Sequence, residues 1–101
     1  MIEQIINNIN YRLDEETLTA EVIEKSEGYE GDIIIPETVM FNTATYRVTS
    51  IGDGAFCGCK SLTDITFQDT IAQWKKINIR DSWNHNIPAT VIHCTDGDVE
   101  I

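Results

Sequence analysis

The apolar residues between positions 51 and 67 recur at a spacing that few structures accommodate. The segment reads IGDGAFCGCKSLTDITF, and its apolar side chains are Ile51, Ala55, Phe56, Cys59, Leu62, Ile65 and Phe67. A long helix requires a period of about 3.6 residues and a half-buried strand a period of about 2, and this spacing follows neither. It is typical of a coil that turns apolar side chains inward at each corner. The segment therefore predicts one unit of a repeat architecture.

The same segment resembles the repeat of the BspA-like branch of bacterial leucine-rich repeat proteins, which reads approximately I-x-x-x-A-F-x-x-C-x-x-L-x-x-I-x-L/I-P. Every anchor is matched, although Phe67 stands at a usually aliphatic position and Gln68 replaces the usual proline. The resemblance implies a short right-handed solenoid of the leucine-rich repeat kind, rich in strands and of the α/β class. It also implies protein–protein contact or adhesion in a secreted or surface-attached bacterial protein.

Two other segments align with part of this unit. DIIIPETV at residues 32–39 aligns with DITFQDTI at 64–71, and VIHCTD at 91–96 forms a third copy. The intervals are 32 residues from Ile33 to Ile65 and 27 residues from Ile65 to Ile92. The first interval is longer because residues 41–48, FNTATYRV, resemble an added hairpin or loop. The alignment predicts parallel strands near residues 33–35, 65–67 and 91–94 in one small sheet.

Both ends of this core have features of caps. Residues 9–23, INYRLDEETLTAEVI, alternate apolar and polar side chains on either side of a turn, which predicts a β-hairpin rather than two unrelated edge strands. Its apolar face must cover something, so we expect a lid over the first coil. Residues 69–77, DTIAQWKKI, predict a short amphipathic helix with Asp69 or Thr70 as N-cap.

The resemblance extends to the closing segment of the chain. In the family a W-x-x-I stretch followed by I-x-C-T-D-G commonly ends the array, and here these residues are Trp74, Ile77, Ile92, Cys94, Thr95, Asp96 and Gly97. The expected organisation is one domain over 1–101. It comprises a hairpin cap at 9–23, a repeat core at 32–67 and a C-terminal cap of helix, loop and strand at 70–96.

The net charge of −10 in 101 residues limits the classes of partner. Residues 1–40 carry ten acidic side chains against Arg12 and Lys25, whereas residues 41–101 carry seven against five basic ones. Nucleic acid and anionic membrane surfaces both require a basic face, so neither is an expected partner. The charge predicts either solubility through self-repulsion or an acidic face for a basic partner.

The three cysteines are Cys57, Cys59 and Cys94, an odd number that does not close a disulfide framework. Cys59 is expected to be buried at an inward repeat position and Cys57 to be more exposed. A zinc site from these thiols with His93 or His85 is disfavoured, because the C-x-C spacing lacks the usual zinc-knuckle pattern. No metal or other cofactor is predicted.

The remaining candidates for chemistry are sparse. Asp96, Asp98 and Glu100 alternate near the terminus, but they lack the other ligands of a calcium loop, and a frayed tail is the expectation there. No Ser or Cys accompanies a histidine in a recognisable triad, so we do not expect an enzyme. Trp74 and Trp83 could stack on a sugar, although their repeat-closing positions favour packing.

These observations predict a non-enzymatic protein-interaction or adhesion module. The candidate binding residues are the outward positions of the strands and their flanks, namely Ile34, Thr49, Asp64, Thr66 and His93. The expected partner is a protein at a host or bacterial surface. The alternative is a structural or capping module of a longer repeat array with no ligand of its own.

No apolar run approaches the length of a membrane span, so membrane insertion is not expected. The opening MIEQIINNIN carries Glu3 where a signal peptide has its basic region, so no signal peptide is predicted. The expected location is extracellular or at the cell surface if a leader was trimmed, and cytoplasmic otherwise.

Overall fold

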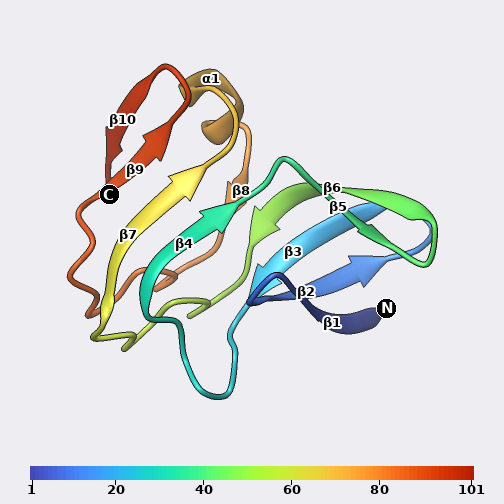
Figure 1. Ribbon diagram of the computed structural model, residues 1–101, viewed down its shortest axis with the longest axis horizontal. Helices are drawn as coiled ribbons and strands as arrows, with labels where there is room; N and C mark the ends of the chain where they lie inside the picture. Colours follow the sequence, from blue (N-terminus) through green and yellow to red (C-terminus); the bar gives the residue numbers. More distant parts are fainter.

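The computed structural model describes all 101 residues and consists of ten strands and one short helix in two sheets (Figure 1). Strands account for 49% of the chain and helix for 4%. The prediction of an α/β solenoid is therefore wrong, because the protein is almost entirely β and both sheets mix parallel and antiparallel strands. No helix in it has the length and apolarity that crossing a bilayer requires.

The helix content falls short because the segments between the parallel strands are turns rather than helices. Helix α1 spans only Ile71–Trp74, with Thr70 as the predicted N-cap, whose side chain accepts a hydrogen bond from the Gln73 N–H at 3.2 Å. Immediately afterwards the chain becomes extended in β8 (Asn78–Ile79), which pairs with the first sheet. The turns at residues 52–61 contain Gly54 and Gly58 at positive φ, a conformation that a helix does not use.

The first sheet, sheet A, has the order β1-β2-β3-β6-β5, with β8 also pairing β6. Its strands are β1 (Ile2–Ile6), β2 (Ile9–Asp14), β3 (Thr19–Ile23), β5 (Thr38–Phe41) and β6 (Ala44–Ile51). The predicted hairpin at 9–23 is confirmed by the antiparallel β2–β3 pair. Residues 41–48, expected to be an added hairpin or loop, are part of a longer hairpin in which β5 and β6 pair antiparallel from Thr38 with Arg47 to Phe41 with Ala44. Strand β1 was not predicted from the sequence.

The second sheet, sheet B, has the order β10-β9-β7-β4. Strands β4 (Gly31–Ile35), β7 (Leu62–Phe67) and β9 (Val91–Cys94) are parallel, and β10 (Gly97–Glu100) returns antiparallel to β9. Ile33 pairs with Ile65 and Ile65 with Ile92, which confirms the sequence alignment of the three copies. The terminal residues expected to fray instead form β10, because Val99 packs on the core.

One apolar core of 22 buried residues lies between the two sheets. Phe56 is fully buried at its centre, with its ring centroid 5.1 Å from that of Tyr29 and 5.9 Å from that of Trp83. Trp74 packs against Trp83 at 5.8 Å between centroids, so both tryptophans serve packing. Cys59 is buried and Cys57 exposed, as the sequence predicts.

Tyr29 holds the connection between the two sheets in place. Its hydroxyl donates to the Ile23 carbonyl at 2.7 Å and accepts from the Asn10 N–H at 3.0 Å. Its own N–H donates to the Cys59 sulfur at 3.3 Å, so one residue bonds to β2, β3 and the loop before β7. Burial raises the pKa of the Tyr29 hydroxyl to about 12. The hydroxyl is therefore a proton-bearing structural group at any physiological pH.

Candidate functional site

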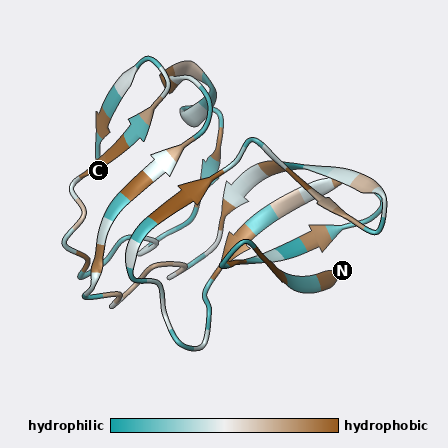
Figure 2. Ribbon diagram, in the orientation of Figure 1, coloured by the Kyte–Doolittle hydropathy of each residue, from teal (hydrophilic) through white to brown (hydrophobic).

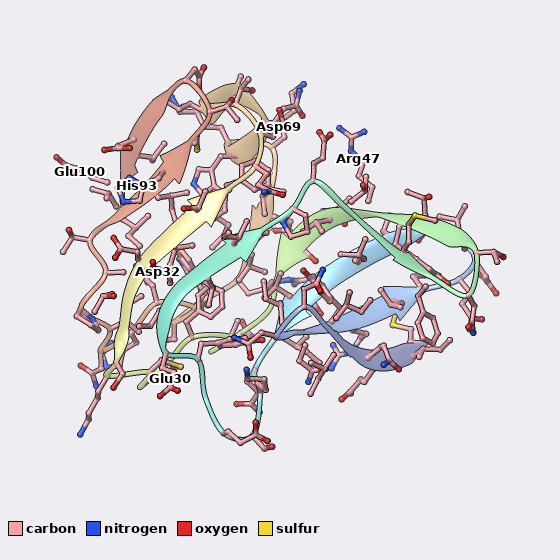
Figure 3. All side chains as sticks on the ribbon, viewed as in Figure 1. Glu30, Asp32, Arg47, Asp69, His93 and Glu100 are labelled. Carbon is pink, nitrogen blue, oxygen red and sulfur yellow. The ribbon has the colours of Figure 1, made fainter.

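The outward side of sheet B carries most of the residues that the sequence singles out. The register aligns Ile34 with Thr66, Thr66 with His93, and His93 with Asp98 in one row across the four strands. Asp32 and Asp64 pair in the neighbouring row. Because side chains alternate along a strand while Ile33, Ile65 and Ile92 are buried, these residues face away from the core. We call the set Asp32, Ile34, Asp64, Thr66, His93 and Asp98 the outer face of sheet B; Figure 3 labels two of its members, Asp32 and His93.

The outer face is acidic around a single histidine. His93 Nδ1 lies 2.9 Å from Asp98 Oδ1, and its Nε2 lies 3.5 Å from Asp64 Oδ1. The hydrogen bond with Asp98 raises the pKa of His93, desolvation opposes this rise, and Asp64 adds a smaller rise. A hydrogen bond with Asp64, together with the repulsion between the two carboxylates, raises the pKa of Asp32. Two carboxylates thus contact the imidazole, and a third, that of Asp32, lies beside Asp64.

The arrangement concentrates negative charge around His93. A carboxylate lies near each of its ring nitrogens, Asp98 beside Nδ1 and Asp64 beside Nε2. No group of three or more His, Cys, Asp or Glu side chains has an arrangement that could hold a metal ion. The carboxylates of Asp32, Asp64 and Asp98 outnumber the one histidine and attract positive charge. Ile34 and Thr66 add one apolar and one polar side chain to the same face.

The structure brings four of the five predicted binding residues together and places the fifth elsewhere. Ile34, Asp64, Thr66 and His93 lie on the outer face, whereas Thr49 is half-buried on β6 in sheet A. Thr49 lines a separate hollow with Arg47 and Asp69, which Figure 3 labels away from His93. Thr49 lies in sheet A because β6 belongs to the added β5–β6 hairpin and is not one of the three aligned strands of sheet B.

Sequence reasoning missed Asp32 and Asp98 as members of this surface. Asp32 could have been found, because it begins the copy DIII at the same position as Asp64 in DITF. Strict alternation then places both on the side of Ile34 and Thr66. Asp98 had a weaker signal, because the sequence after Cys94 did not reveal a further strand. Only its pairing with His93 in the β9–β10 hairpin places it there.

A groove borders the outer face at strand β4. It has a volume of about 550 Å³ and lies between β4, the β1–β2 turn and β5. Its apolar walls include Ile9, Tyr11 and Val39 on the inner side and Ile34 and Met40 near the opening. Ile34 is 53% exposed and Met40 66% exposed, so the opening of the groove presents two accessible apolar side chains. We call this feature the β4 groove, and Figure 2 shows that the second half of β4 is strongly apolar.

The comparisons with known proteins give one informative likeness. No protein-family model matches the chain, and no curated protein matches it. The crystal structure of a leucine rich cell surface protein from Faecalibacterium prausnitzii A2-165 is similar, with a TM-score of 0.67 and 21% sequence identity. The match covers 95% of this chain and 24% of that one, so this chain spans about a quarter of the other protein's length. At this identity the likeness concerns the fold, and it supports the leucine-rich repeat resemblance at that level.

Proposed function

We propose that this chain is a non-enzymatic protein-interaction module of a bacterial surface or secreted protein, with the outer face of sheet B as its binding surface. The observation that carries the proposal is the row Ile34–Thr66–His93–Asp98, flanked by Asp32 and Asp64. It presents a flat set of contact residues with carboxylates that no Lys or Arg of the chain pairs with. Such a surface attracts a partner with exposed basic groups.

The location is part of the same proposal. The similar crystal structure is described as a cell surface protein, and the fold likeness covers nearly the whole of this chain. We therefore place the module outside the cell, where adhesion to a host or bacterial surface protein is its role. Membrane insertion and nucleic-acid binding form no part of it, in keeping with the net charge of −10.

A second candidate function is a structural or capping module within a longer protein. The observation that favours it is the coverage, because this chain corresponds to 24% of the similar protein. A module of that kind would use its surface against neighbouring modules of the same polypeptide and would have no separate ligand. Binding to an independent protein distinguishes the two functions.

The test is binding to an array of purified host and bacterial surface proteins, with one variant on the outer face and one control. Thr66→Arg places a positive, bulky side chain at the centre of the row. Thr17→Arg makes the same change in the exposed β2–β3 turn of sheet A, remote from sheet B (Figure 1). We expect Thr66→Arg to weaken binding of the captured ligand by about tenfold or more, and Thr17→Arg to leave it unchanged. Equal binding by both variants would contradict the proposed surface.

A further inference from the structure

Strand β4 has one unpaired side. It pairs with β7 alone, whereas at the opposite end of sheet B strand β9 is covered by β10. The Ile35 carbonyl accepts from the Gln68 N–H at 2.9 Å, so the backbone groups of Ile35 face β7. Because these groups alternate along a strand, those of Ile33 also face β7, while those of Asp32 and Ile34 point to the free edge. Two residues therefore offer N–H and C=O groups to an additional strand.

The free side of β4 opens on the β4 groove. Asp32, Ile34 and the residue after the strand, Pro36, line the groove together with Ile9 and Tyr11 of sheet A. A strand laid beside β4 would have two different environments. Its inward side chains would meet Ile9, Tyr11 and Val39, and its outward side chains would continue the outer face beside Asp32.

We propose that the β4 groove binds an extended segment of a partner protein, which adds to sheet B as a further strand and alternates apolar with basic residues. Strand addition supplies affinity through main-chain hydrogen bonds and specificity through alternate side chains. The inference rests on the proposed function and names its partner more closely. Charge complementarity selects the basic residues, because Asp32 is the one charged side chain lining the groove and no Lys or Arg lines it.

A second copy of this chain fits the edge poorly. Its own β4 reads Gly-Asp-Ile-Ile-Ile and would bring another Asp32 to an edge that already has Asp32 and, in the same row, Asp64. Each copy also carries a net charge of −10, so association of two copies at this edge is opposed by repulsion. A partner segment with Lys or Arg at alternate positions would instead offset the negative charge of Asp32 and Asp64.

The direct test uses synthetic peptides and the whole chain. The probe is an end-capped peptide of alternating lysine and valine, with alternating glutamate and valine as its matched control. We expect the lysine peptide to slow hydrogen exchange of the Asp32 and Ile34 amides at least about tenfold, because these amides are unpaired in the free chain. The glutamate peptide should leave both amides unchanged. Binding without protection at these two amides would overturn strand addition.

Variants of β4 separate the backbone contribution from the charge contribution. Ile34→Pro removes an N–H from the free edge and leaves the hydrogen bonds to β7 in place, whereas Ile34→Val retains the N–H as control. We expect the proline variant to lose peptide binding and the valine variant to keep it. Asp32→Lys needs no backbone change, so it remains informative if the proline variant does not fold. It should weaken the lysine peptide about tenfold and make the glutamate peptide the better ligand.

The outcomes distinguish this inference from the proposed function, because Thr66 lies outside the groove. Loss of array binding in Thr66→Arg with unchanged binding in Ile34→Pro, which removes the free-edge N–H, would overturn strand addition and leave the outer face as the binding surface. If the lysine peptide binds at β4 but Thr66→Arg does not weaken binding of the array ligand, strand addition is supported. The proposal that the rest of the outer face binds the partner is then contradicted. A concentration-dependent dimer that Asp32→Lys strengthens and Ile34→Pro abolishes would assign the edge to a second copy and overturn the inference.

Discussion

Sheets A and B use their charged residues differently. On sheet A the Arg12 guanidinium lies 3.1 Å from Glu21 and 3.9 Å from Glu3, so two of its acidic strand residues have a basic partner within the sheet. On sheet B the carboxylates of Asp64 and Asp98 have only the His93 ring. Sheet A therefore has Arg12 between two of its carboxylates, whereas no Lys or Arg pairs with a carboxylate of sheet B. The contrast teaches that net charge alone does not distinguish the two sheets, whereas the pairing of individual charges does.

The two sheets also differ in how the chain builds them. Sheet A contains three antiparallel pairs of consecutive strands, β1–β2, β2–β3 and β5–β6. The parallel pairs of sheet B join residues that are far apart, such as Ile33 with Ile65. Both sheets nevertheless bury their inner faces in one core. We therefore expect sheet B to depend on sheet A for its stability.

The largest effect should follow deletion of residues 1–23, which removes β1, β2 and β3. This segment supplies Tyr11, Leu13 and Val22, all nearly or fully buried, so the deletion exposes the part of the shared core that they cover. At about 25 cal/mol per Å² of apolar surface, a few hundred Å² of lost burial is comparable to the whole stability of a small domain. We expect a chain without a cooperative thermal transition by circular dichroism. A soluble product that melts cooperatively would show that sheet B stands alone.

The next largest effect should come from Phe56→Ala, because Phe56 lies in the core that the two sheets share. We expect the free energy of unfolding to fall by about 3–5 kcal/mol, the usual cost of emptying an aromatic core site. Tryptophan fluorescence and far-ultraviolet circular dichroism should report the same lowered melting temperature. Phe56→Leu, which retains most of the apolar volume, is the control and should cost less. Separate transitions for the two probes would disprove a common core.

A smaller effect is expected from Tyr29→Phe, which removes the hydroxyl that links β2 and β3. The Asn10 N–H and the Ile23 carbonyl lose their partner, and an unsatisfied buried group costs about 1–3 kcal/mol. Chemical denaturation at neutral pH measures the change. Tyr46→Phe is the matched control, because the structure shows no hydrogen bond from the Tyr46 hydroxyl. Equal costs for the two variants would mean that the Tyr29 hydroxyl has no special role.

The same residue predicts a loss of stability in alkali. The pKa of Tyr29 is raised in the folded protein to about 12 from an ordinary value of 10.0, so the folded state holds its proton more tightly than the unfolded state. The resulting stabilisation is complete below the unfolded value and is lost as the pH rises through the folded one. Denaturation midpoints between about pH 9 and about pH 12 should fall less steeply in Tyr29→Phe than in the parent chain. If the denaturation midpoints fall equally steeply with pH in both proteins, Tyr29 is not the cause of the loss of stability in alkali.

The smallest effect concerns the charge imbalance on sheet B. Asp98→Asn removes the main cause of the raised pKa of His93, so that pKa should fall toward its ordinary value. A histidine whose pKa is raised in the folded state stabilises the fold fully below its unfolded-state pKa, and this stabilisation is lost as the pH rises through the folded-state pKa. The stability of the variant should therefore depend less on pH across that interval. Proton NMR of the His93 ring measures the shift. Asp96→Asn is the control, because Asp96 bonds to the Ile71 N–H instead. If the pKa of His93 falls equally in Asp98→Asn and Asp96→Asn, the contact between His93 and Asp98 is not the cause of the raised pKa.

The sequence predicts those parts of the fold that have a short or repeated pattern. The hairpin at 9–23 follows from alternation on both sides of a turn, and the parallel strands follow from three aligned copies. The α/β class was wrong because the resemblance suggested helical connections, whereas the segment after Trp74 becomes the extended strand β8. Strand β1 carries its own signal, in that Ile2 and Ile6 precede an Asn7–Asn8 turn with both residues at positive φ.

The candidate site was predictable where it follows strand alternation. Ile34, Thr66 and His93 are outward positions of aligned strands, and the register places them side by side. The contacts of His93 with Asp64 and Asp98 could not be predicted, because they depend on which strands are neighbours and on the return of β10. The β4 groove depends on the relative placement of two sheets, for which no local pattern gives a signal.

The position of Asp32 and Pro36 at the two ends of the Ile33–Ile35 run also bears on folding. The run is apolar and rich in β-branched residues, and its pairing partner Ile65 follows it by 32 residues. Long-range parallel pairing forms late, so the run stays uncovered while the rest of the chain is still being made. A charge on one side and a proline on the other interrupt intermolecular cross-β stacking of such a segment. We therefore expect the carboxylate that we assign to a basic partner also to oppose aggregation of the nascent chain.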